Sequence, residues 1–345
     1  MKCKLMHRRE HKLKKGKLNR CLFCYDILSV GDTDFHHKCS KKFFGSPLPP
    51  KLPYTAEEIN ELAEKIVRSQ VTVTGVQPKL SLHLEKKGRA SKNGPKSGTT
   101  NDRLTIVGLW GGYIFKPPTE EYPELPAIED LTMHLAEVAA IKTVPHTLIR
   151  FKSNELAYIT RRIDRIEKSG TRLPMEDMCQ LTERLTEDKY RGSMEQIGKI
   201  IRAHSSNPGF DVITLLEITL FSFLVGNADM HLKNFSLIRT DLEGEDLVAL
   251  APAYDLVATR LVLPADKEQL ALQMNGRKSN IGIGDFRKFA GYLGILDNVM
   301  NSSIERIKGS ISTMSKVIDK SFLSIGMKGK YKTLIAERAH ILHLD

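Results

Sequence analysis

The sequence predicts an α+β protein of two lobes, one rich in strands and one made mainly of helices. Before about residue 175, apolar and polar residues alternate with a period of two at 71–87 and other segments have strand character, whereas beyond it helical patterns dominate. A chain of 345 residues is also long enough for about two domains. A strand-rich half followed by a helical half predicts two lobes with a cleft between them.

The basic charge of the chain lies almost entirely at its start. The net charge is +11, and the first twenty residues hold nine Lys or Arg against one Glu, so residues 1–20 carry +8 of it. The remainder is only about +3, which argues against a strongly basic nucleic-acid-binding surface on the folded body. We expect residues 1–20 to form a basic, disordered tail.

The sequence predicts neither secretion nor a membrane span. The basic start is not followed by the clean apolar core of a signal peptide. The longest apolar run, 212–225, is interrupted by Glu217 and is too short to cross a bilayer, so we expect a buried helix there. Five cysteines without a dense pairing pattern favour a reducing compartment. We therefore expect a cytoplasmic protein without membrane contact.

Composition and periodicity divide the rest of the chain into a Cys/His segment at 21–46, a strand-rich lobe at 47–175 and a helical lobe at 176–345. Thr55 and Glu58 form a capping box that predicts a helix over 55–70. Alternation at 71–87, interrupted by Gly75, predicts a strand, a turn and a strand. The other expected elements are strands within 104–118, 147–151 and 156–165, helices over 127–141, 194–206, 211–225, 283–296 and 302–320, and a short β element within 235–255.

Polar residues crowd together after the apolar run, in the stretch FLVGNADMHLKNFSLI at 223–238. Asp229 and Asn234 have the spacing D-x-x-x-x-N, and Asp255 follows a further apolar segment. Phosphoryl transfer needs one carboxylate to orient the attacking hydroxyl, and an amide with a second carboxylate to hold Mg²⁺ against the phosphates. A tight loop would fold Asn234 back beside Asp229, so that both serve one metal region.

The strand-rich lobe supplies the other residue types that such a site needs. Lys116 ends the predicted strand YIFK, and Glu129 opens the next helix. In kinases a strand lysine contacts the ATP phosphates and a helix glutamate holds that lysine in place. Gly75 lies between two predicted strands, where bare backbone N–H groups can approach phosphates. The Gly turn, the strand lysine, the helix glutamate and the polar loop follow one another in the order found in kinases. The sequence therefore predicts a kinase.

Several stretches together carry a resemblance to a known family: VTVTGVQPKLSL, YITRRIDR, LPMEDMCQ, GNADMHLKNFSL and YDLVAT. They resemble the HipA family of bacterial toxin kinases over roughly residues 21–345, which implies a two-lobed, protein-kinase-like fold. HipA proteins carry an additional N-terminal subdomain where this chain has its Cys/His segment. In this respect the chain is most similar to HipT, the short toxin of tripartite HipBST systems, in which a separate small protein resembles that subdomain.

The resemblance implies a role for each matching residue of the polar stretch. Asp229 matches the catalytic aspartate, and Asn234 and Asp255 match the Mg²⁺ ligands. Lys116 matches the lysine that contacts the ATP phosphates. His231 is expected to contact the γ-phosphate or to support the loop.

Two further groups of residues complete the predicted nucleotide site. Lys233 is a candidate phosphate ligand, although exposed loop lysines are common. The segment PMEDMCQ, with Glu176 and Met178, matches the hinge that contacts adenine.

The resemblance also implies a regulatory role for the Gly loop, which includes Thr72, Thr74, Gly75 and Val76. The two threonines match serine positions that family members autophosphorylate. A phosphate there would place nearly two negative charges where the ATP phosphates should sit, or would pull the loop out of the cleft. The alternative is that both threonines are β-branched strand residues chosen for packing.

The Cys/His segment offers a different kind of site. Cys21 and Cys24 form a C-x-x-C knuckle, followed by His36, His37 and Cys39. Three thiolates and one imidazole make a closed tetrahedral zinc site, for which we favour His36 over His37. The alternative is a metal-free knuckle packed by neighbouring phenylalanines. Either role is structural, because a closed site leaves no position for a substrate.

The favoured function is a Ser/Thr protein kinase that acts as the toxin of a type II toxin–antitoxin system. The resemblance implies ATP and Mg²⁺ as cofactors and an aminoacyl-tRNA synthetase as target. The implied partners are a HipS-like small protein and a HipB-like antitoxin, with DNA contacted only through the antitoxin. The alternatives are a small-molecule or lipid kinase with a similar D-x-x-x-x-N loop, and a non-catalytic, zinc-containing DNA-binding regulator.

Overall fold

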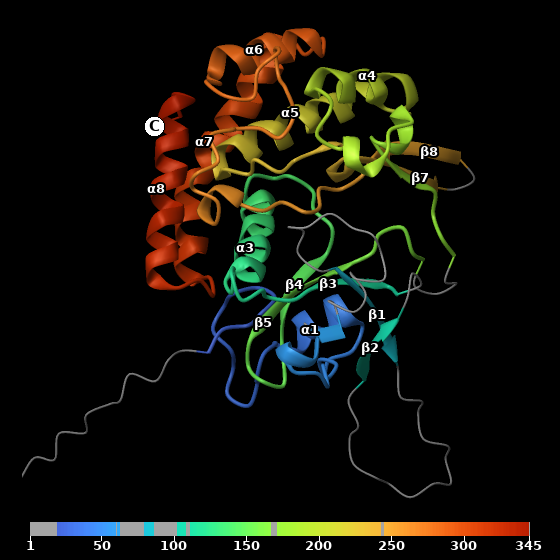
Figure 1. Cartoon of the computed structure of the whole chain (residues 1–345), viewed down its shortest axis with the longest axis vertical. Helices are drawn as coiled ribbons and strands as arrows, with labels where there is room; N and C mark the ends of the chain where they lie inside the picture. The colour runs from blue at the N-terminus through green and yellow to red at the C-terminus, as the bar shows by residue number, and fades with distance from the viewer. Residues whose placement is uncertain are drawn as a thin grey trace, which may run out of the picture.

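The computed structural model describes residues 19–59, 61–62, 79–85, 102–107, 111–166, 171–242 and 245–344. Its elements form two lobes, with the strand-rich lobe below the helical lobe in Figure 1. The predicted α+β class is confirmed. The predicted tail up to residue 18 and the Gly loop at 72–76 lie outside the described residues.

A five-stranded antiparallel sheet forms the centre of the first lobe. Its strands are β1 (Leu80–Glu85), β2 (Arg103–Val107), β3 (Tyr113–Lys116), β4 (His146–Arg150) and β5 (Leu156–Arg161), in the order β2-β1-β3-β5-β4. The central strand β3 buries Tyr113 and Phe115 and pairs with β5 in a register that sets Lys116 opposite Tyr158. Three of its four residues are buried, including Lys116, as expected of a central strand.

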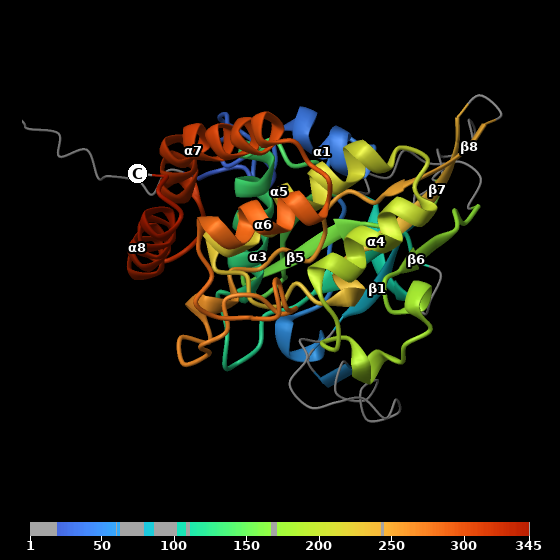
Figure 2. The same cartoon turned by 90° about the horizontal axis from the view of Figure 1, so that it is seen from above.

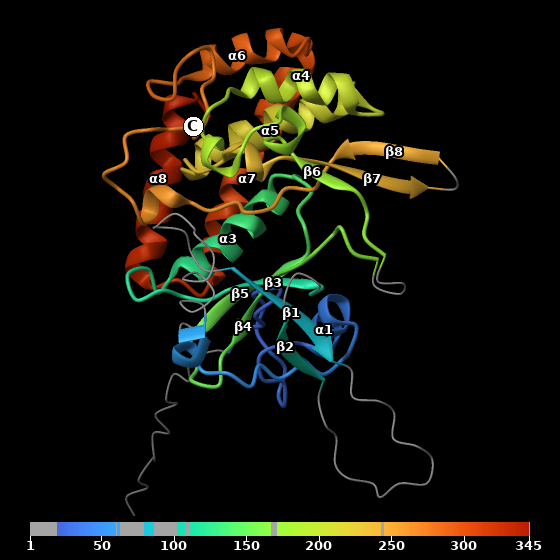
Figure 3. The ribbon, with the colours of Figure 1, turned by 45° about the vertical axis from the view of Figure 1, so that its right-hand side comes forward.

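Two helices accompany this sheet. The helix α3 (Leu125–Val138) packs on β4 and β5, and also on α7 of the other lobe. It therefore lies between the lobes (Figure 3). The short helix α1 (His37–Phe44) belongs to the Cys/His segment, and its Phe43 and Phe44 rings contact Tyr113 of β3. The Cys/His segment thus shares the hydrophobic core of the strand-rich lobe.

The second lobe is mainly helical. Its longer helices are α4 (Met194–His204), α5 (Pro208–Val225), α6 (Ile283–Tyr292), α7 (Asp297–Lys320) and α8 (Ile325–Ile341). The strands β6 (Met175–Asp177), β7 (Ser236–Leu242) and β8 (Glu245–Leu250) form a second antiparallel sheet in that order. Short 3₁₀ helices occupy Gln180–Thr182, Thr186–Asp188, Leu232–Asn234 and Thr259–Leu261. Figure 2 shows α5 among α4, α6 and α8.

The helix α5 is the core of the helical lobe. It contacts α4, α6, α8 and β8, and side chains such as Leu215, Leu220 and Phe221 are fully buried. Among the described residues it is the one helix with the length and hydropathy of a membrane span, yet 67% of that window is buried inside the protein. This burial is typical of a core helix and agrees with the expectation for 212–225.

The structure confirms the capping box and adds two helices that the sequence did not indicate. Thr55 N–H donates to Glu58 Oε2 at 2.8 Å, and Glu58 N–H donates to Thr55 Oγ1 at 3.2 Å. The helix α8 was not predicted because glycines interrupt it and its apolar residues form no clear stripe. The helix α1 was not predicted because its two turns are too short to show periodicity.

The left-handed turn that ends α5 gives a test of this packing. Gly226 has φ +70°, and a Cβ there would meet Leu334 at 2.8 Å and Arg260 at 3.0 Å. Gly226→Ala should lower the free energy of unfolding by about 2 kcal/mol or more, measured by urea denaturation. Gly309→Ala, in open space on the exposed face of α7, is the control and should stabilise by up to about 1 kcal/mol. Wild-type stability of Gly226→Ala would contradict the described turn.

Candidate active site

Lys116 joins three elements where the two lobes meet. Its Nζ donates to Glu129 Oε1 of α3 at 2.5 Å and to Asp255 Oδ1, in the segment after β8. Lys116 and Glu129 are buried, at 4% and 0% exposure. Removing one partner of such a buried ion pair is strongly destabilising, so the cluster fixes β3 and α3 against the segment of the second lobe.

Asp255 occupies an unusual backbone position. Its φ is +59°, in the left-handed region that non-glycine residues rarely adopt. Its second carboxylate oxygen, Oδ2, accepts from Lys79 Nζ at 2.7 Å. The segment is anchored nearby, because Ala253 N–H donates to the Lys142 carbonyl and Ala253 O accepts from Val144 N–H. Backbone strain of this kind clusters at functional sites.

The charges of this cluster are not evenly compensated. For Asp255, burial alone would raise the pKa, but Lys116 and Lys79 hold the pKa of its carboxyl well below the usual range. For Lys116, burial would lower the pKa, but the two carboxylates outweigh it and keep the amine protonated, with a raised pKa. Burial raises the pKa of Glu129 to about 7 in spite of Lys116. Asp255 is paired with two lysines and Glu129 with Lys116, and Glu129 Oε2 has no hydrogen-bond partner among the described residues.

A tight loop after α5 carries Asp229. The Asp229 carbonyl accepts from His231 N–H at 2.8 Å and from Asn234 Nδ2 at 2.9 Å. Asn227 Oδ1 accepts from Asp229 N–H at 3.1 Å and fixes the start of the loop. The D-x-x-x-x-N spacing therefore brings Asn234 back beside Asp229.

His231 and Lys233 lie on the same loop but differ in surroundings. His231 is 6% exposed, its Nδ1 has no hydrogen-bond partner among the described residues, and burial lowers its pKa to about 4. Lys233 Nζ donates to Asp177 Oδ2 at 2.8 Å. His231 is therefore neutral near pH 7, and Lys233 is engaged by a carboxylate at the end of β6.

The predicted hinge residues lie on and after β6. Glu176 is exposed and pairs with Leu237 of β7. Met178 is fully buried, and its N–H donates to the Phe235 carbonyl at 3.0 Å and to the Leu232 carbonyl at 3.2 Å. The backbone of Met178 thus ties the hinge to the loop of Asp229. The Gly-loop residues Thr72, Thr74, Gly75 and Val76 lie outside the described residues.

Two site residues were missed from the sequence. Lys79, which binds Asp255, directly follows the predicted Gly loop, and its place beside a phosphate-binding loop could have marked it. Tyr190 donates its hydroxyl to Asp229 Oδ1 at 2.6 Å, and burial together with this bond raises its pKa. No spacing or periodicity in the surrounding sequence points to Tyr190.

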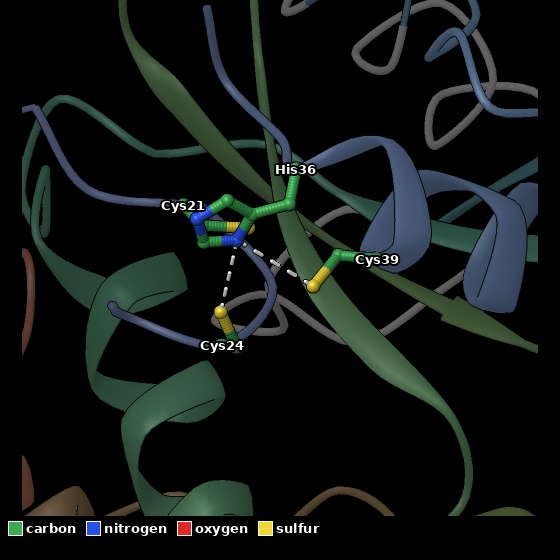
Figure 4. A group of neighbouring side chains, drawn as sticks. All are labelled: Cys21, Cys24, His36 and Cys39. Atoms are coloured by element: carbon green, nitrogen blue, oxygen red, sulfur yellow. Dashed lines mark hydrogen bonds between the residues drawn. The ribbon is translucent and has the colours of Figure 1, made fainter. Parts of the chain in front are cut away.

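The predicted zinc ligands form a separate cluster, shown in Figure 4. One ligand atom from each of Cys21, Cys24, His36 and Cys39 lies within 4.8 Å of the others. His36 Nδ1 is 3.4 Å from Cys24 Sγ and 3.8 Å from Cys39 Sγ. His37 is instead exposed, with its Nε2 3.7 Å from Asp32. The structure thus brings His36, rather than His37, to the three cysteines.

The lowered pKa of His231 predicts an acid-sensitive loop. The unfolded chain takes up this proton near pH 6.5, whereas the folded protein resists it until about pH 4. The stability that is present above pH 6.5 should therefore fall progressively toward pH 4, by about 3 kcal/mol. The free energy of unfolding, measured by denaturation at each pH over this range, should depend less on pH for His231→Asn than for wild type. His204→Asn, on the exposed face of α4, is the control, and equal pH dependence in both variants would refute the burial effect.

Comparison with known proteins gives the family. The model of the HipA-like C-terminal domain matches residues 71–315. A Haemophilus influenzae protein named "Putative kinase" is 28% identical over 341 residues, 90% of each chain. The serine/threonine-protein kinase toxin HipA of Shewanella oneidensis is 27% identical over 260 residues, which cover 70% of this chain and 55% of that toxin.

A solved structure agrees with these matches in fold. The structure of the Shewanella oneidensis MR-1 toxin–antitoxin system HipA and HipB with operator DNA superposes with a TM-score of 0.64 and 24% identity, over 85% of this chain and 72% of that one. This likeness shows the two-lobed, kinase-like HipA fold. Because the family model covers more than two thirds of this chain, the chain belongs to the family of proteins with a HipA-like C-terminal domain.

Proposed function

We propose that the protein is an ATP-dependent serine/threonine protein kinase. The observation that carries this proposal is the convergence of Lys116, Glu129 and Asp255 at the junction of the lobes. A strand lysine held by a helix glutamate, next to an acidic residue from the other lobe, is the arrangement that phosphoryl transfer uses. The names of the relatives, which include kinases and a kinase toxin, support the same chemistry.

The nucleotide would lie between the Gly loop and the hinge. Lys116 and Lys79 would contact the phosphates, together with the backbone N–H groups that the sequence assigns to Gly75 and Val76. The adenine would lie beside Glu176 on β6, which is the edge strand of its sheet among the described strands. Since the Met178 N–H is already used within the protein, the free edge of β6 offers the remaining backbone groups.

The donor set at the junction fits Mg²⁺, which prefers oxygen ligands. Asp255 offers a carboxylate, and Asn234 offers its amide oxygen because its Nδ2 already donates to Asp229. Asp255 bound to the metal would release Lys116 to the phosphates. Zinc at the Cys/His cluster would take no part in this transfer, because four protein ligands leave no position for a substrate.

Asp229 would orient the attacking hydroxyl. The Tyr190 hydroxyl shows that an O–H group can reach Asp229 Oδ1, at 2.6 Å. A substrate serine or threonine in that position would donate to the same oxygen and attack the γ-phosphorus. As the new O–P bond forms, the bond from the γ-phosphorus to the β–γ bridging oxygen would break, ADP would leave and the hydroxyl proton would pass to Asp229. His231, neutral near pH 7, presents an unpartnered Nδ1 that can hydrogen-bond the γ-phosphate or support the loop. The Lys233–Asp177 pair favours a supporting role for Lys233.

In the cell we place this activity in a toxin–antitoxin system of the cytoplasm. The solved relative contains HipA, HipB and operator DNA. By analogy this chain would bind a HipB-like antitoxin and reach DNA only through it. The proposed short HipT type adds a HipS-like small partner, and the proposed target class is an aminoacyl-tRNA synthetase. These finer assignments follow from the sequence resemblance.

Transfer from labelled ATP tests the proposal directly. Wild-type protein with Mg²⁺ and a bacterial extract should label a protein, whereas Asp229→Asn should reduce the rate by about 10²-fold or more. Asp319→Asn is the matched control, because this exposed carboxylate on α7 pairs with Lys332 of α8, at 2.7 Å, and none of the site residues named above contacts it. Label transferred only to small molecules or lipids would favour the alternative kinase classes.

Mapping the label tests the regulatory expectation in the same experiment. We expect phosphate on Thr72 or Thr74 in wild type, and none when both are changed to Ala. If the protein binds ATP but neither wild type nor any variant transfers labelled phosphate, the kinase proposal is contradicted and the non-catalytic regulator is favoured.

A further inference from the structure

The Cys/His cluster has the geometry of a tetrahedral zinc site. Zn–S bonds of about 2.3 Å and Zn–N bonds of about 2.0 Å in a tetrahedron place S and N roughly 3.6 Å apart. The distances from His36 Nδ1 to Cys24 Sγ, 3.4 Å, and to Cys39 Sγ, 3.8 Å, bracket this value. The fourth ligand, Cys21 Sγ, lies within 4.8 Å of the others.

The surroundings of the cluster prepare His36 as a ligand. Its Nε2 is 3.0 Å from the Ile27 carbonyl, which can only accept, so Nε2 carries the proton and Nδ1 is left with a free lone pair. A backbone carbonyl that fixes the ring in this way is the usual outer partner of a metal-bound histidine. Cys21 and Cys39 are buried, at 0% and 5% exposure. A metal held by these four side chains would therefore be enclosed by the protein.

The knuckle that would hold the metal also orients Tyr25. The Tyr25 N–H donates to the Cys21 carbonyl at 2.9 Å, and Tyr25 has φ +63°, a left-handed turn directly after Cys24. This turn sends the buried Tyr25 ring toward α3, where its hydroxyl donates to Asp130 Oδ2 at 2.7 Å. Asp130 also accepts from His146 Nδ1 at 2.7 Å and is fully buried. Tyr25 is thus one of two hydrogen-bond donors to a buried carboxylate.

Further contacts fasten the knuckle to the kinase-like core. The Leu22 carbonyl accepts from Thr147 Oγ1 at 3.0 Å and from Leu148 N–H at 3.4 Å, both on β4. Asp26 pairs with Lys320 at the end of α7 at 2.9 Å. The knuckle therefore contacts β4, α3 and α7, and α3 itself packs on the other two elements.

We propose that Cys21, Cys24, His36 and Cys39 bind one structural zinc ion, and that the zinc-held knuckle positions α3 through the Tyr25–Asp130 hydrogen bond. Asp130 is the residue next to Glu129, which binds Lys116. Loss of the metal would free Tyr25, leave Asp130 with one donor fewer and loosen the helix that holds Glu129. The consequence for catalysis rests on the kinase function proposed above, whereas metal binding and the order of α3 do not.

Metal content of the purified full-length chain tests the site itself. We expect about one zinc per chain by elemental analysis, and tetrahedral thiolate spectra after exchange with Co²⁺. Cys24→Ser and Cys39→Ser should lose the metal. Cys179→Ser is the control, because the Cys179 thiol is buried outside the cluster. This variant should keep the metal. A chain that binds neither Zn²⁺ nor Co²⁺ would overturn the proposal.

Hydrogen exchange tests the coupling without relying on activity or on removal of the metal. Tyr25→Phe keeps all four ligands and should retain zinc, but peptides from α3 should exchange about tenfold faster or more, since a hydrogen bond to a buried charge is lost. Peptides from α6, which contact neither the knuckle nor α3, should be unchanged. Unaltered α3 exchange in a zinc-loaded Tyr25→Phe protein would refute the coupling even if the site binds metal.

Discussion

The arrangement of the site depends on one buried cation shared by two carboxylates. Lys116 at the end of β3 reaches Glu129 of α3 and Asp255 of the second lobe. A buried charge of this kind must be paired, and each partner comes from a different element, so the pairing aligns all three. Because Asp255 has Lys79 as well, Glu129 is the weaker-compensated acid, which agrees with its raised pKa.

The second half of the site depends on a rigid support. The buried helix α5 ends at Gly226, whose left-handed conformation turns the chain into the loop of Asp229 and Asn234. The loop is also held from the hinge, through the Met178 N–H and the Lys233–Asp177 pair. Hinge and loop therefore form one hydrogen-bonded unit, to which Tyr254 is tied because its hydroxyl donates to the Lys233 carbonyl at 3.0 Å. The next residue, Asp255, receives Lys116 from the other lobe.

Local sequence patterns predicted much of this arrangement. The residues that these patterns did not reveal act through contacts between distant parts of the chain. Apolar strand character located the strand that ends at Lys116, and the spacing of Asp229 and Asn234 predicted a loop that closes on itself. The C-x-x-C knuckle and His36 were found because ligand spacing is a local property. Tyr190 could not be found, since its bond to Asp229 spans 39 positions and no repeat marks it. The Tyr25–Asp130 bond spans 105 positions and depends wholly on how the segments pack.

The most direct measurement of the central claim is the affinity for ATP with and without Mg²⁺, by calorimetry on wild type and Asp255→Asn. Asp255 holds Lys116 in the structure described, and a metal on Asp255 would release that lysine to the phosphates. We therefore expect Mg²⁺ to strengthen ATP binding to wild type by about tenfold or more, and to have little effect on Asp255→Asn. Wild-type protein that binds no ATP, or binds it equally well without Mg²⁺, would contradict the account.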